Sequence, residues 1–210
     1  MMRIWLGMLV SGGLCFSGLA EDLGMVPPAT NQPVALNMSM AEKGALIEAA
    51  ELLRGGDLNR AETVLHRVLE RSPENLEARQ LWLALLVQTD RYEETRQAFE
   101  AMYKSFESDF KFLNNYAWFL ATAENTSYRD PARAIDLARA ALLLAPEVYN
   151  IWSTLAEAYY ADGDFERSVN TMQEAINLAT RFGAEAPVIE NYRNELRKMA
   201  EANAVMNLME

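Results

Sequence analysis

The stretch NIWSTLAEAYYADGDFERSVNTMQEAINLA, residues 150–179, decides the fold of this chain. Apolar and small residues recur every three or four positions on both sides of Gly163 and Asp164, a spacing typical of amphipathic helices. Glycine readily ends a helix because it adopts the left-handed conformation, and aspartate caps the free N–H groups that begin the next helix. The stretch therefore predicts two helices joined by a tight turn.

The same helix–turn–helix pattern occurs four times along the chain. The position where each first helix crosses its neighbour, usually a small residue, recurs at spacings of 34, 34 and 39 residues: Ala49, Leu83, Ala117 and Ala156. The corresponding position early in each second helix recurs at spacings of 34, 39 and 34 residues: Ala61, Thr95, Ala134 and Ser168. Both series give a period of 34 with five residues inserted in the third unit. Because one such pair cannot bury its apolar face alone, we expect the units to stack.

These units resemble the tetratricopeptide repeat, whose signature is W-x2-L-G-x2-Y, then A-x3-F, then P. The fourth unit matches best, with Trp152, Leu155, Ala156, Tyr159 and Ser168. The second diverges most, since Leu83 takes the small position and Glu107 replaces the proline. The resemblance implies an all-α, right-handed α-solenoid with repeats at about 42–75, 76–109, 110–148 and 149–182. A C-terminal capping helix over 186–208 follows the repeats.

Residues that favour helix starts occur where this register needs them. Ser39 with Glu42 forms a capping box, and Asp57 and Asp164 precede second helices as N-caps. Asp130 followed by proline ends the inserted loop 124–129 and begins a helix. The segment 114–134, NNYAWFLATAENTSYRDPARA, resembles a variant of the repeat that is common in bacterial proteins.

The last predicted helix, from about 187 to 206, is amphipathic. Its apolar face should pack on the fourth unit: Val188, Tyr192, Leu196, Met199, Ala202 and Met206. Its charged face should meet solvent: Glu190, Arg193, Glu195, Arg197, Lys198 and Glu201. The apolar tip, Val205, Met206, Leu208 and Met209, is either a frayed terminus or a docking peptide.

The N-terminus has the order of a secretory signal: Arg3, an apolar run over 4–20, and acidic residues from Glu21. We expect cleavage after Ala20, with an uncleaved membrane anchor as the alternative, while Gly12 and Leu14 disfavour lipid attachment at Cys15. Residues 21–38 contain three prolines and no helical period, which predicts a flexible leader. These features predict export to the periplasm or cell envelope, with membrane contact only through an uncleaved N-terminal segment.

The formal charge of −11, or −12 without Arg3, argues against nucleic-acid partners, which need a field of basic residues. Without Cys15, a single histidine remains for zinc or nucleophilic chemistry, and His66 is expected on the surface. Asp162, Asp164 and Glu166 alternate like calcium ligands, but they occupy the turn of the repeat itself. We therefore expect no catalytic residue, no metal and no small-molecule cofactor.

The resemblance implies a concave groove lined by the first helices, which holds a peptide or a partner helix. Carrying the groove positions over gives the expected partner-binding residues: Lys43, Leu46, Gln80, Ala84, Lys111, Asn114, Trp118, Asn150, Ser153, Glu157 and Tyr160. Lysine and asparagine can hold a carboxylate or a peptide backbone, and Trp118 and Tyr160 offer apolar area beside them. Trp118 could equally cover a neighbouring helix. The set departs from the full carboxylate clamp of chaperone-binding members, so recognition of chaperone tails is not implied.

The sequence thus favours a non-enzymatic scaffold that binds a protein or peptide in its groove. The alternative is a structural subunit of an envelope or secretion assembly that docks through its convex face or C-terminal helix. A hydrolase using groove carboxylates such as Glu77 and Glu157 is the least favoured interpretation.

Overall fold

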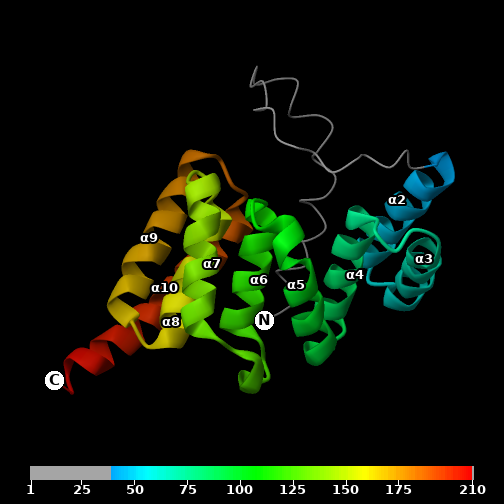
Figure 1. Ribbon diagram of the computed structural model, residues 1–210. Coiled ribbons are helices and arrows are strands. Elements are labelled where there is room, and N and C mark those ends of the chain that lie inside the picture. The colour runs from blue at the N-terminus through cyan, green and yellow to red at the C-terminus, as the bar shows by residue number, and fades with distance from the viewer. Residues whose placement is uncertain (1–38, 210) are drawn as a thin grey trace. The chain divides into compact units, whose positions relative to one another are not determined.

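The computed structural model describes residues 39–209, which form two compact units within 1–95 and 96–210 (Figure 1). Within the described residues there are nine α-helices, one short 3₁₀ helix and no strand. The predicted signal and leader, 1–20 and 21–38, lie outside the described residues. The all-α class expected from the sequence is confirmed.

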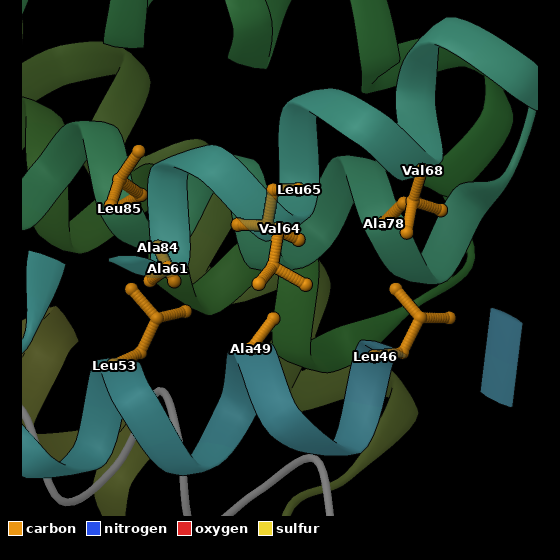
Figure 2. Close-up of a cluster of buried hydrophobic side chains, with 10 residues drawn as sticks. All are labelled: Leu46, Ala49, Leu53, Ala61, Val64, Leu65, Val68, Ala78, Ala84 and Leu85. Atoms are coloured by element: carbon orange, nitrogen blue, oxygen red, sulfur yellow. The ribbon is translucent and has the colours of Figure 1, made fainter. Parts of the chain in front are cut away.

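Unit 1 contains three complete helices: α2 (Met40–Gly55), α3 (Leu58–Arg71) and α4 (Leu76–Gln88). The boundary between the units falls inside α5 (Tyr92–Phe106), after Thr95. Small residues at the helix crossings, such as Ala49 and Ala61, let the helices approach closely, and leucines from each helix fill the remaining space. Figure 2 shows this aliphatic core: Leu46, Ala49, Leu53, Ala61, Val64, Leu65, Val68, Ala78, Ala84 and Leu85.

Unit 2 continues from α5 through α6 (Phe110–Thr122), a 3₁₀ helix η2 (Thr126–Tyr128), α7 (Pro131–Leu144), α8 (Tyr149–Asp162), α9 (Phe165–Arg181) and α10 (Ala186–Asn207). Antiparallel neighbours pack as the pairs α6–α7 and α8–α9, and α10 packs on α9. The core beside α5 is aromatic: Phe99 stacks on Tyr116 with ring centroids 4.5 Å apart, and both Phe112 and Phe119 lie 5.6 Å from Phe99.

The predicted caps are confirmed. Ser39 and Glu42 form a capping box, and Ser72 Oγ also donates to the Glu42 carboxylate at 2.6 Å. These hydrogen bonds lower the pKa of Glu42, led by the one from Ser72. Asp57, Asp164 and Asp130 each accept a hydrogen bond from the N–H of a residue in the first turn of the helix they cap.

One backbone hydrogen bond recurs at every turn between paired helices. In the turns without an insertion, an N–H donates to the carbonyl five residues earlier: Asp57 to Leu52, Arg91 to Leu86, and Asp164 to Tyr159. In the third turn Asp130 N–H donates to Leu120 O at 3.0 Å, ten residues earlier. The five inserted residues therefore loop out without breaking this link, and they fold into η2, which the sequence analysis did not predict.

The left-handed residue that closes these turns is glycine in two of them, with φ of +80° at Gly56 and +85° at Gly163. The turn between α4 and α5 has no glycine, and Asp90 takes φ +54° instead. Aspartate tolerates this region better than most residues because its short polar side chain bonds locally.

Candidate partner-binding surface

The expected binding residues of unit 1 separate by polarity. Lys43 on α2 and Gln80 on α4 are exposed, whereas Leu46 and Ala84 are only 2% and 3% exposed and belong to the core cluster of Figure 2. The two apolar side chains stabilise the packing of α2, α3 and α4. A partner at these helices would therefore contact Lys43 and Gln80.

Unit 1 also has a hollow of about 320 Å³ between α2 and α3, which no pattern in the sequence indicates. Acidic Glu42 and Glu48 and basic Arg67 and Arg71 line it together. Its charges are balanced, and none of the expected binding residues lies in it.

In unit 2, three expected residues follow one face of α6. Lys111, Asn114 and Trp118 are spaced by three and four residues, the spacing of neighbours on a helix surface. Lys111 and Trp118 are half-buried, and Lys111 Nζ lies 5.9 Å from the centre of the Phe110 ring. Asn114 is 9% exposed, and its Oδ1 is buried without a hydrogen-bond partner among the described residues. A buried acceptor without a partner is uncommon in folded proteins.

The expected residues of α8 contact α10 of the same chain. Tyr192 donates from its hydroxyl to Asn150 Oδ1 at 2.9 Å, and Ser153 Oγ donates to the same hydroxyl oxygen at 3.3 Å. Tyr192 is buried, which raises the pKa of its phenol. Its ring also meets Tyr149 edge to face with centroids 6.2 Å apart.

One turn further along α8, two acidic groups and one ammonium group meet. Glu157 is 8% exposed, and Lys198 Nζ of α10 lies 3.9 Å from its carboxylate. The same Nζ lies 3.0 Å from Glu195 and 4.5 Å from the centre of the Tyr160 ring. We call Glu157, Glu195 and Lys198 the carboxyl–lysine cluster.

Burial raises the pKa of Glu157 to about 7, although the ammonium of Lys198 acts in the opposite direction. Burial lowers the pKa of Lys198, but the attraction of the two carboxylates outweighs it, and the net shift is upward. Each shift has the cause expected for charged groups brought together away from water.

The solvent-facing role predicted for Glu195 and Lys198 holds only in part. The side chain of Glu195 is 19% exposed, and that of Lys198 is 40% exposed while its ammonium approaches Glu157 of α8. Helical periodicity placed them opposite the apolar residues of α10, but Glu157 is an acid on a largely buried face, and a buried carboxyl needs a charged or hydrogen-bonding partner. No pattern within α10 alone could have shown that need.

The other residues considered for catalysis or metal binding make contacts within the fold. His66 is exposed and meets Trp82 edge-on with centroids 4.7 Å apart. Asp164 caps α9 and pairs with Arg167. Over residues 39–209 no three His, Cys, Asp or Glu side chains are grouped as a metal site would require, and no helix has the length and apolarity to cross a bilayer.

Paired antiparallel helices with one recurring turn hydrogen bond define an all-α fold of repeated helix pairs. Solved structures with a similar fold include two of MamA. "MamA 41-end from Desulfovibrio magneticus RS-1" matches with a TM-score of 0.58 and 18% identity, covering 82% of this chain and 97% of that one. "MamA RS-1 ArsTM double mutant" matches with a TM-score of 0.57 and 16% identity, covering 79% and 98%. No protein-family model and no curated protein matches the sequence.

Proposed function

We propose that this protein is a non-enzymatic scaffold of the bacterial cell envelope that binds a peptide or a partner protein along the first helices of four repeats. The repeats would be the helix pairs α2–α3, α4–α5, α6–α7 and α8–α9. The fold shared with MamA supports a role in protein interaction, because stacked helix pairs present extended binding surfaces. The N-terminal sequence, with its order of charge, apolar run and small residues, supports export.

The observation that carries the proposal is the surface of α6. There a positive charge, an amide whose acceptor has no partner within residues 39–209, and an indole lie on one helix face, at Lys111, Asn114 and Trp118. Rotation of the buried amide would offer its oxygen to a backbone N–H of a bound segment. The lysine would attract a carboxylate, and the indole would supply apolar contact area.

The test is crosslinking in the native envelope, followed by identification of the partner by mass and measurement of its affinity. Lys111→Glu combined with Trp118→Ala should lower the affinity at least tenfold. Lys104→Glu, which makes the same charge change on an exposed position of α5, is the matched control and should bind normally. Equal affinity of both variants would remove the α6 surface from the proposal.

A second candidate is docking through the C-terminal tip, as expected of a structural subunit. Val205, Met206, Leu208 and Met209 are 56%, 42%, 87% and 78% exposed, which is unusual for four neighbouring apolar side chains. Ending the chain at Ala204 should release the protein from its assembly if the tip docks. The α6 variant would then remain in the assembly, so the two candidates give opposite results.

A further inference from the structure

Helix α10 is held to α8 by polar side chains rather than by close backbone packing. The main neighbour of α10 is α9, and Met199 of α10 is fully buried. Tyr192 and Lys198 extend from α10 to Asn150, Ser153 and Glu157 on α8. All four residues of α8 that the repeat register assigns to partner binding, Tyr160 included, thus touch this chain's own last helix.

We propose that α10 is a proton-controlled latch. It holds the binding residues of α8 while the two acids of the carboxyl–lysine cluster carry one proton between them, and α10 loosens when that proton leaves. The consequence for partner binding rests on the proposed function, since the latch would then set how much of the first-helix surface is open. The latch itself concerns only this chain.

The geometry of the cluster favours one proton on its acids. Two carboxyl groups share one ammonium, because Lys198 Nζ lies 3.9 Å from Glu157 and 3.0 Å from Glu195, and Glu157 is only 8% exposed. When two acids share such a site, one of them is harder to ionise. With that proton present, the remaining carboxylate and the ammonium of Lys198 balance. Without it, two negative charges share one positive charge at a site where Glu157 is largely removed from water.

The charged and titratable groups that face Glu157 come from three segments. Lys198 and Glu195 face it from α10, and Arg129, which precedes α7, adds a weaker attraction. Within α8, the Tyr160 ring lies against Lys198 rather than against the carboxyl. Removing the proton therefore adds repulsion on the α10 side that Lys198 alone must offset.

The direction of the pH effect follows from linkage. The pKa of Glu157 is about 7 with α10 docked, and 4.5 is the ordinary value that it would regain in water. An acid whose pKa is raised in the docked state favours docking fully below 4.5, and this contribution is lost as the pH rises through 7. The equilibrium constant for opening of α10 should therefore increase roughly a hundredfold between pH 5 and pH 8.

Hydrogen exchange of the full chain, read by mass spectrometry and corrected for intrinsic exchange, tests the latch without any partner. Amides of residues 193–204 should lose protection by this factor from pH 5 to pH 8, while amides of α7 change little. In Glu157→Gln the pH dependence should disappear, because glutamine has no carboxyl group to titrate. Glu201→Gln, an exposed acid of the same helix, is the matched control and should behave as the unmodified chain.

Equal pH dependence of α10 exchange in the unmodified chain and in Glu157→Gln would overturn the latch. If the glutamine variant fails to fold, the carbon-13 resonance of the Glu157 carboxyl in the unmodified chain decides instead. A midpoint near 7 supports the latch, and a midpoint near 4.5 overturns it. Neither result bears on whether a partner binds at α6, so the latch and the proposed function can fail separately.

Discussion

The first helices of the repeats treat polar residues differently at equivalent positions. Gln80 in unit 1 is exposed, while Asn114 and Ser153, which follow it at the repeat spacings of 34 and 39 residues in unit 2, are buried. In α8 the polar side chains meet a tyrosine and a lysine from α10. A repeat position therefore has no fixed exposure, since the element packed against it decides whether a polar side chain contacts water or protein.

The cores differ as well. Unit 1 buries leucine, valine and alanine, whereas the α5–α6 region of unit 2 buries three aromatic rings around that of Phe99. An aromatic ring buries more area than an aliphatic side chain, and stacked rings add a geometric preference. Unit 2 should therefore depend more strongly on a single side chain than unit 1 does.

The largest effect is expected from truncating these cores. Phe99→Ala should lower the free energy of unfolding of unit 2 by about 4 kcal/mol, and Leu53→Ala that of unit 1 by about 3 kcal/mol, since both side chains are fully buried. Urea denaturation followed by hydrogen exchange in each unit measures the two losses. A smaller loss for Phe99→Ala than for Leu53→Ala would contradict the contrast between the cores.

The next effect depends on pH and belongs to unit 2 alone. Because the pKa of Glu157 is raised to about 7 from 4.5, its contribution to stability is present at pH 4 and lost as the pH rises through 7. Glu157→Gln should match the unmodified chain at pH 4 and exceed it by roughly 2–3 kcal/mol at pH 8. Thermal unfolding at both pH values checks this, and a variant less stable at pH 8 would refute the assignment of Glu157.

The sequence predicted most of the fold because its signals are local. Gly163 and the capping aspartates act within a few residues of the turns they specify, and the period of 34 shows where the same local pattern recurs. The turn of the second unit was predicted, but its left-handed residue, Asp90, was not, because it is not glycine. Helix η2 was not predicted. The sequence shows that five residues are inserted here, but only the hydrogen bond between Asp130 and Leu120 shows that they loop out and leave the turn intact.

The candidate site was less predictable. The repeat register located the residues of α8, but it could not show that Tyr192 and Lys198 would contact them, because α10 lies outside the repeat pattern. Leu46 and Ala84 face the core because the adjacent helices of unit 1 approach closely there. Such outcomes depend on contacts between segments distant in the sequence, which periodicity within one helix does not describe.

A moderate effect is expected from removing one hydroxyl group. Tyr192→Phe keeps the ring but leaves Asn150 Oδ1 without its donor, and Ser153 Oγ keeps only its acceptor in the backbone carbonyl of Asn150. Loss of hydrogen bonds at a buried site should lower the free energy of unfolding of unit 2 by about 1–2 kcal/mol. Chemical denaturation at fixed pH measures the loss, and the exposed aromatic change Phe182→Leu serves as the control. No loss in Tyr192→Phe would mean that water replaces the phenol.

The smallest effect on stability is expected at the equivalent surface of unit 1. Lys43→Ala and Gln80→Ala remove exposed side chains, so each should change the free energy of unfolding by less than about 0.5 kcal/mol. If these side chains serve partner binding, the double variant should fold normally yet bind the partner several-fold more weakly, as measured by titration calorimetry. Lys104→Ala, which removes an exposed lysine outside the first helices, controls for net charge. A double variant that binds normally would confine the binding surface to unit 2, and the contrast between the units would then be one of function as well as of burial.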